Sequence, residues 1–290
     1  MRRPLRIICS HPTLYDLNVR FASKSRRYTV SEHVKGICSM AGVEGRVAFV
    51  TGGGRGIGRA AAEILAARGA RVMCIARGQQ ELAATGLEYS VADLGTQEGC
   101  AHAVADTEQR LGPIEILVCN HGIGSAHERV VWEQEPDIWS ETMRVNLDGP
   151  FHLSRLALRG MVERRYGRVV YTSSTAGLVA EYAGSAYNSS KHGLLGLMRS
   201  VAQDGGAFGI TSNAVLPGWV RTAMAERHAD QEATDRGITA DAVWDERAAL
   251  YPPGRVATPG EVAEMIAFLA AEESSGVSGE AIRVALGSVS

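Results

Sequence analysis

The sequence lacks any run of 18 consecutive apolar residues, and it lacks paired cysteines. The first absence argues against a membrane-spanning helix, which needs about 20 such residues. The cysteines are odd in number, show no Cys-x-x-Cys spacing, and are Cys9, Cys38, Cys74, Cys100 and Cys119. We also recognise no secretory signal. This pattern favours a reducing compartment and argues against both a disulfide framework and a zinc site.

Basic charge is also scarce over most of the chain. Residues 40–290 contain 22 Lys and Arg against 30 Asp and Glu, whereas residues 1–39 contain eight against two. An acidic body argues against nucleic-acid binding. We therefore predict an N-terminal extension, residues 1–39, followed by a catalytic domain, residues 40–290.

Three origins of the extension stay open. Met40 reads like a natural start just ahead of the first strand, so residues 1–39 would be an overextended start. Their Arg-rich, acid-poor composition also suits an organellar transit peptide. The third alternative is a disordered arm that contacts a partner. We expect a cytoplasmic protein, or a mitochondrial or other organellar one if the extension is a transit peptide.

From residue 46 onward, short apolar runs alternate with helical segments. We expect strands at 46–50, 71–76, 87–91, 114–119, 167–172, 211–216 and 281–286, and helices at 59–68, 97–111, 137–165, 185–207 and 259–271. Continuous apolar strands, each followed by a helix, predict a parallel sheet covered on both faces. The predicted fold class is α/β, a single domain with a doubly wound parallel sheet of about seven strands.

A glycine-rich loop, Thr51-Gly52-Gly53-Gly54-Arg55-Gly56-Ile57-Gly58, directly follows the first strand and opens a helix. Glycines permit positive φ and a close approach of backbone to a pyrophosphate, whose charge suits a helix N-terminus. A structural turn would use the same residues. The strand–loop–helix context nevertheless favours a nucleotide site.

Lysine is almost absent beyond residue 39. Lys191 is the single example among 21 arginines, and it follows Tyr187 by four residues. Residues four apart share one helix face, about 6 Å between Cβ atoms. An ammonium there would lower the pKa of the phenol toward the range of a general acid. The alternative is an ordinary surface pair on a helix.

Together, TGxxxGxG and YxxxK make the chain resemble the short-chain dehydrogenase/reductase family in its short, single-domain Rossmann form. Within the family, the chain resembles 3-oxoacyl-carrier-protein-reductase-like members. The resemblance covers about residues 44–287. Ser174, thirteen residues before the tyrosine, and Asn146, in Val-Asn-Leu, match the other members of the family's catalytic tetrad. The run Asn213–Thr222 matches a further family motif.

The resemblance implies specific roles. Tyr187 would be the general acid, Ser174 would hold the carbonyl oxygen, and Lys191 would stabilise the tyrosinate and bind the cofactor ribose. Asn146 would hold a water that links the lysine to solvent. Asp93 would bond the adenine and Thr222 the nicotinamide carboxamide. The expected cofactor-binding residues are Gly52, Arg55, Gly56, Ile57, Gly58, Arg77, Asp93, Leu94, Asn120, Gly122, Tyr187, Lys191, Pro217, Gly218, Val220 and Thr222.

The end of the second strand carries the choice of cofactor. NAD-binding relatives place a carboxylate there for the ribose hydroxyls, whereas this chain has Ala76 followed by Arg77. Arg55 lies in the glycine loop, although a loop arginine often faces solvent. Two guanidinium groups favour a 2′-phosphate, and hence NADP(H), with NAD(H) as the alternative.

The substrate is less well defined. We expect a variable lid at about 223–251, with Met224, Trp244 and Tyr251 as apolar contacts, and no metal. His121 replaces a small residue of the family, and we favour a structural role for it over a contact with cofactor.

The sequence predicts an NADPH-dependent reductase that converts a small carbonyl substrate to a secondary alcohol. The alternatives are an NAD-dependent alcohol or polyol dehydrogenase and a catalytically silent nucleotide-binding protein. By resemblance, we expect a homotetramer or homodimer built on the helices at 137–165 and 185–207.

Overall fold

The computed structural model describes residues 42–124 and 129–288. Predictions about the extension, residues 1–39, lie outside these ranges. Within them, no helix combines the length and the apolar character that a membrane crossing requires.

Strands and helices alternate along the chain as predicted. The strands are β1 (Val47–Thr51), β2 (Arg71–Ala76), β3 (Glu88–Val91), β4 (Ile116–Cys119), β5 (Gly167–Thr172), β6 (Ile210–Pro217) and β7 (Ala281–Val284). The helices are α2 (Gly56–Ala67), α3 (Gln79–Ala83), α4 (Gln97–Leu111), α5 (Pro136–Met143), α6 (Gly149–Arg164), α7 (Ser185–Gly205), α8 (Ala223–Arg236), α9 (Ala240–Ala249) and α10 (Pro259–Leu269).

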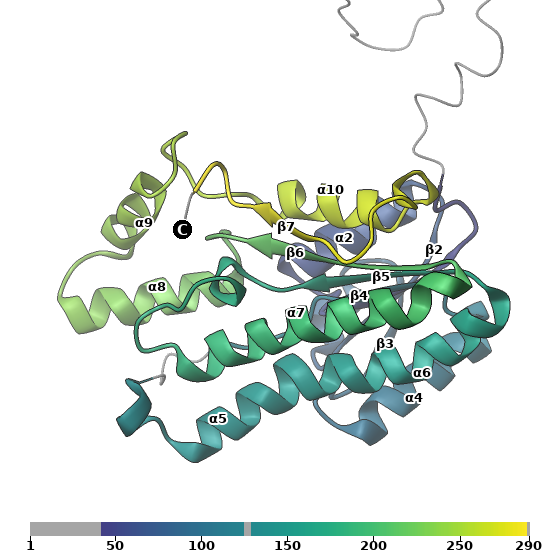
Figure 1. The fold of residues 1–290 in the computed structure, drawn as a ribbon. Coiled ribbons are helices and arrows are strands. Elements are labelled where there is room, and N and C mark those ends of the chain that lie inside the picture. The colour runs from purple at the N-terminus through teal and green to yellow at the C-terminus, as the bar shows by residue number, and fades with distance from the viewer. Residues whose placement is uncertain (1–41, 125–128, 289–290) are drawn as a thin grey trace, which may run out of the picture. The chain divides into compact units, whose positions relative to one another are not determined.

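The strands form one parallel seven-stranded sheet in the order β3-β2-β1-β4-β5-β6-β7 (Figure 1). The register places Val50 of β1 beside Cys74 of β2 and Val118 of β4. The order reverses between β1 and β4, and such a switch point is where doubly wound sheets bind ligands, beyond the carboxyl ends of their strands. The predicted fold class is confirmed.

Alternate residues of each strand pack into two separate cores. Ala48 and Val50 of β1 lie in the core under α2 and α10, whereas Phe49 lies in the core under α4, α6 and α7. Figure 1 shows α2 and α10 on one face of the sheet and α4, α6 and α7 on the other. Because both faces are covered, the strands are continuous apolar runs rather than alternating ones.

The helix predicted over 137–165 is interrupted. It consists of α5, a π-helical turn at Arg144–Asp148, and α6. A π turn widens the helix and leaves a backbone carbonyl without its usual intrahelical partner, and such turns are frequent at functional sites. Asn146 lies in the middle of this one.

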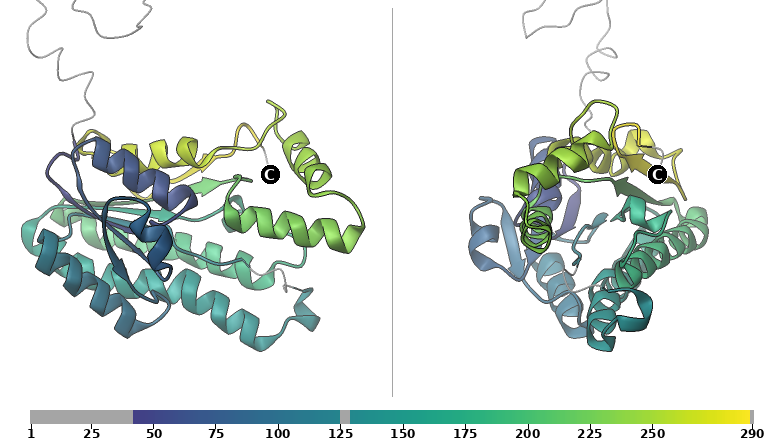
Figure 2. Two further views of the ribbon diagram at one scale, coloured as in Figure 1. Left: turned by 180° about the vertical axis from the view of Figure 1, so that it is seen from behind. Right: turned by 90° about the vertical axis from the view of Figure 1, so that its left-hand side faces the viewer.

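The lid segment folds as two helices with a small core of its own. Ala225, Ala229 and Ala233 of α8 pack against Val243 and Trp244 of α9. Figure 2 shows α8 and α9 side by side beyond one end of the sheet.

Four of the helices begin at a threonine whose side chain accepts a backbone hydrogen bond at the N-cap position. These residues are Thr96, Thr222, Thr239 and Thr258.

Candidate active site

A cleft of about 550 Å³ opens at the carboxyl ends of the strands, between the glycine loop and the lid helix α8. The predicted residues that line it are Gly52, Arg55, Gly56, Ile57, Arg77, Asp93, Leu94, Asn120, Gly122, Ser174, Tyr187, Lys191, Pro217, Gly218, Val220 and Thr222. Gly58 and Asn146 lie behind its wall instead. The structure therefore brings the separated motifs to one place.

The glycine loop fits a nucleotide closely. Gly52 and Gly56 have φ of 67° and 57°, which disfavour a side chain. A Cβ on Gly58 would lie 2.3 Å from the carbonyl oxygen of Gly52, so α2 begins directly against the loop. Because these positions carry no side chain, the backbone N–H groups at this helix N-terminus are open to a pyrophosphate.

Lys191 lies beneath Tyr187 on α7. Its Nζ is 5.5 Å from the centroid of the tyrosine ring, and the lysine side chain is almost fully buried, with 4% of its surface exposed. Nζ donates a hydrogen bond to the carbonyl of Thr172, at the end of β5, at 3.0 Å. Burial lowers the pKa of Lys191 to about 8.

Asn146 holds the loop after β4. Its Oδ1 accepts from the backbone nitrogen of Ile123 at 2.8 Å, and its Nδ2 donates to the carbonyl of Ile123 at 2.8 Å and to Ser190 Oγ at 3.1 Å. A Cβ on Gly122 would lie 3.1 Å from Asn146 Oδ1 and 3.4 Å from Lys191 Nζ. A side chain here would press on Asn146 and would be in ordinary contact with Lys191.

Both serines after β5 make hydrogen bonds to the backbone. In the structure Ser173 Oγ donates to the carbonyl of Lys191 at 3.1 Å, whereas Ser174 Oγ accepts from the backbone nitrogen of Ala176 at 3.2 Å. Ser174 lines the cleft and keeps its hydroxyl proton available to donate.

His121 is bonded to the first strand. Its Nδ1 lies 2.8 Å from Thr51 Oγ1, and its Nε2 is buried with no hydrogen-bond partner among the described residues. Burial, and then the charge of Lys191, lower the pKa of His121 to about 4. The ring is therefore neutral at ordinary pH. The neighbouring Asn120 Nδ2 donates to the carbonyl of Thr51 at 3.1 Å.

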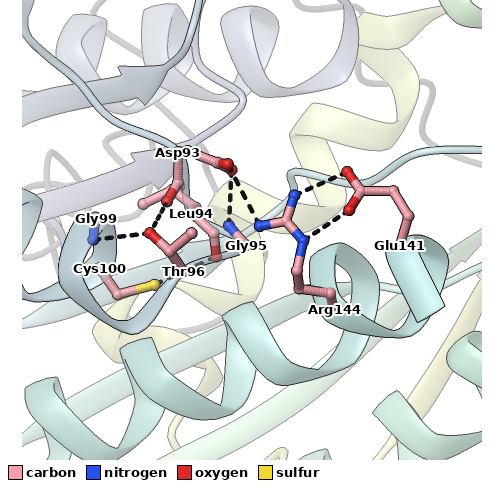
Figure 3. Close-up of polar contacts among 8 residues, drawn as sticks. All are labelled: Asp93, Leu94, Gly95, Thr96, Gly99, Cys100, Glu141 and Arg144. Atoms are coloured by element: carbon pink, nitrogen blue, oxygen red, sulfur yellow. Dashed lines mark hydrogen bonds and ion pairs between the residues drawn. The ribbon is translucent and has the colours of Figure 1, made fainter. Parts of the chain in front are cut away.

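Asp93, the predicted adenine contact, is paired with Arg144 in the π-helical turn between α5 and α6. Figure 3 shows the Arg144 guanidinium between the carboxylates of Asp93, at 3.3 Å, and Glu141, at 2.6 and 2.8 Å. Burial opposes ionisation of Asp93, but the backbone N–H of Gly95 and the charge of Arg144 outweigh it and lower the pKa. This ion-pair network joins the loop after β3 to α5 and to the π-helical turn that contains Asn146. Sequence reasoning missed it.

The cleft end beside β2 carries charges of both signs. Arg77 is exposed there, and Arg55 Nη1 lies 3.8 Å from Glu81 Oε1 on the short helix α3. Glu81 also lines the cleft and was missed, because α3 was not predicted from the sequence.

The opposite end of the cleft is formed by the loop after β5, by α8 and by the segment after α9. Tyr251 Oη accepts from the backbone nitrogen of Trp219 at 2.6 Å and so supports the turn after β6. Met224 lines the cleft as expected, but Trp244 is absent from its lining and packs in the lid core. Glu181 and His228, which the sequence gave no reason to select, also line this end.

Comparison with known proteins agrees with this geometry. A family model described as enoyl-(acyl carrier protein) reductase matches residues 52–288. The chain is 34% identical to an acetoacetyl-CoA reductase of Shinella zoogloeoides over 82% of this chain and 95% of that protein. It is 33% identical to a 3-oxoacyl-[acyl-carrier-protein] reductase of Vibrio cholerae over 83% and 96%. The chain belongs to the short-chain dehydrogenase/reductase family.

Solved structures give the same result. Levodione reductase superposes with a TM-score of 0.79 at 29% identity, covering 83% of this chain and 96% of that one. An actinorhodin polyketide ketoreductase variant with NADPH superposes with a TM-score of 0.77 at 31% identity and the same coverage. The protein is an NAD(P)-dependent oxidoreductase of this family that acts on alcohol and carbonyl groups.

Proposed function

We propose that the protein reduces a ketone to a secondary alcohol with NADPH, and that Tyr187 is the general acid. The observation that carries this proposal is the buried ammonium of Lys191 beneath the ring of Tyr187, inside the cleft that the glycine loop also lines. A positive charge next to a phenol favours its ionised form and so assists proton donation.

Each catalytic side chain has a distinct task. When a reduced nicotinamide cofactor is bound in the cleft, it would supply the hydride for the carbonyl carbon. Tyr187 donates its hydroxyl proton to the carbonyl oxygen, and Ser174 donates a hydrogen bond to the same oxygen as negative charge develops there. Lys191 stabilises the tyrosinate that remains. Asn146, held on the backbone of Ile123, keeps the floor of the cleft in place beside Lys191.

The residues expected to hold the cofactor fit it. The glycine loop would receive the pyrophosphate, Asp93 and Leu94 would flank the adenine, and Thr222 would meet the nicotinamide amide. Arg77 and Arg55 would bind a 2′-phosphate, which favours NADP(H), because guanidinium groups match phosphate oxygens in pairs.

Glu81 is the observation that favours the second candidate, an NAD(H)-dependent alcohol dehydrogenase. Its carboxylate lies at the same end of the cleft and is close to Arg55. A carboxylate there would accept bonds from ribose hydroxyls and repel a 2′-phosphate. Arg77→Asp is expected to move the preference toward NADH, and Glu81→Gln to move it further toward NADPH. Unchanged selectivity in both variants would contradict the assignment to NADP(H).

The reaction is tested by NADPH consumption against a panel of ketones. Turnover is expected with the wild type and a loss of about 10²-fold or more in kcat for Tyr187→Phe. Tyr89→Phe is the matched control, because Tyr89 lies on β3 and is absent from the lining of the cleft. Equal turnover by Tyr187→Phe and the wild type would refute the role of Tyr187.

Three further expectations are proposals. A homodimer or homotetramer on α5–α6 and α7 is supported by two exposed aromatic side chains, Trp139 and Phe151, on the first of these surfaces. A monomer at micromolar concentration by sedimentation would refute it. We also propose that residues 1–39 lie outside the catalytic domain and that the protein is cytoplasmic. Both proposals are tested by comparing the full chain with a chain that starts at Met40.

A further inference from the structure

In the described part of the chain, the substrate end of the cleft is lined by a carboxylate and no arginine. Among the described residues, the cations that line the cleft are Arg55 and Arg77, beside the expected adenosine site, and Lys191 beneath Tyr187. The substrate end contributes the carboxylate of Glu181 and the imidazole of His228. Burial lowers the pKa of His228 and so disfavours the charged form of this ring.

The arginines of the lid are held by partners of their own. Arg247 is 5% exposed, lies 3.7 Å from the centroid of the Trp219 ring, and donates to Glu232 at 2.9 Å. Arg221 pairs with Glu226 at 2.9 Å, and Arg236 pairs with Glu232 and Glu246, both at 2.7 Å. These guanidinium groups are therefore already neutralised by carboxylates.

Arg227, the remaining lid arginine, lines an adjoining hollow between α5 and α8 together with Asp230 and Glu141. This hollow shares Arg77, Gly124 and His228 with the catalytic cleft, but Arg227 itself is absent from the lining of the cleft. Over residues 219–251 as a whole, seven Asp and Glu stand against four Arg, so this segment carries a net charge of −3. An anion that approached across the lid would meet net repulsion.

The rim of the cleft is apolar. Tyr182, from the loop after β5, and Leu250, after α9, are 90% and 64% exposed and both line the cleft. Leu178 and Val179 add further exposed apolar surface on the loop that carries Tyr182. Large exposed apolar side chains around a pocket are typical of binding surfaces for apolar partners.

We propose that the substrate is a free, apolar ketone without phosphate or carboxylate groups, rather than a ketone carried as a thioester on a phosphorylated carrier. The proposal rests on the proposed function and names its substrate class. Coenzyme A and the phosphopantetheine arm of a carrier protein both bring phosphates to the mouth of the cleft. The acidic lid and Glu181 oppose such groups. Apart from the buried Lys191, no Lys or Arg among the described residues lines this end of the cleft.

The test compares three compounds that carry the same acetoacetyl group as an ester or a thioester: ethyl acetoacetate, acetoacetyl-N-acetylcysteamine and acetoacetyl-CoA. With NADPH at low salt, the two uncharged compounds are expected to give kcat/KM at least about tenfold above that of the CoA thioester. The gap should shrink at about 0.5 M salt, because salt screens the repulsion. A CoA thioester equal to or better than the N-acetylcysteamine thioester would overturn the proposal.

A charge-reversal variant separates repulsion from simple bulk. Glu181→Lys is expected to raise kcat/KM for acetoacetyl-CoA relative to acetoacetyl-N-acetylcysteamine. Glu108→Lys, the same change on the exposed outer surface of α4, should leave that ratio unchanged. An unchanged ratio in Glu181→Lys would count against the proposal. Failure of the proposed function looks different, since the wild type would then reduce none of the three compounds.

Discussion

The side-chain nitrogen of Lys191 donates a hydrogen bond to the backbone carbonyl of Thr172 at 3.0 Å. This bond ties the middle of α7 to the end of β5 and fixes the ammonium beneath Tyr187. Since the site is almost fully buried, a group of different shape does not fit there without movement of its neighbours.

Replacement of Lys191 therefore separates charge from shape. Lys191→Met removes the charge, and Lys191→Arg keeps it on a larger, planar group that cannot take the same position. Both variants are expected to lose about 10²-fold or more in kcat/KM for ketone reduction. Steady-state kinetics with NADPH provide the measurement. Activity of Lys191→Arg close to the wild type would show that a general positive charge suffices.

Ketone reduction should also depend on pH through this lysine. Burial lowers the pKa of Lys191 to about 8, so the ammonium form predominates below that pH and is lost above it. The kcat/KM for reduction, which reports the free enzyme, is expected to fall as pH rises through about 8. A flat profile to about pH 10 would contradict the role of the ammonium.

Asn146 is expected to contribute to stability as well as to activity. Asn146→Ala removes three hydrogen bonds and leaves the N–H and C=O of Ile123 without their partner. We expect the free energy of unfolding to fall by about 1–3 kcal/mol. Asn146→Asp, which retains an acceptor for the Ile123 N–H, should lose less. Urea denaturation of both variants would show the difference, and equal stability to the wild type would contradict it.

Cofactor binding should be sensitive to a single methyl group in the glycine loop. Gly58→Ala places a carbon 2.3 Å from the carbonyl oxygen of Gly52 and 2.4 Å from Asn120 Nδ2. The loop must move, and the Kd for NADPH is expected to rise about tenfold or more. Gly276→Ala is the control, because nothing lies within 4 Å of its added carbon. Fluorescence titration with NADPH provides the comparison.

Much of the fold follows from local patterns. Strand residues such as Ala48, Phe49 and Val50 are apolar in succession because both faces of the sheet are covered, and this property is legible in the sequence. The positions of Ser174, Tyr187 and Lys191 follow from fixed spacings along one strand end and one helix.

Other features depend on contacts that spacing does not encode. The π turn at Asn146 interrupts a pattern that reads as one continuous helix. Arg144 forms an ion pair with Asp93, which lies 51 residues earlier in the chain. It also pairs with Glu141, three residues before it. Trp244 is a large aromatic side chain of the kind that contacts apolar substrates, but it is buried in the lid against the alanines of α8.

Hydride transfer to a ketone leaves an isotopic label in the product alcohol. The purified protein would be incubated with NADPH deuterated at the nicotinamide C4 position, in separate experiments for the two faces, and with the ketones of the panel. We expect a secondary alcohol with deuterium on the carbinol carbon from one labelled face, and loss of this product in Tyr187→Phe. Cofactor that binds without any labelled alcohol would contradict this expectation.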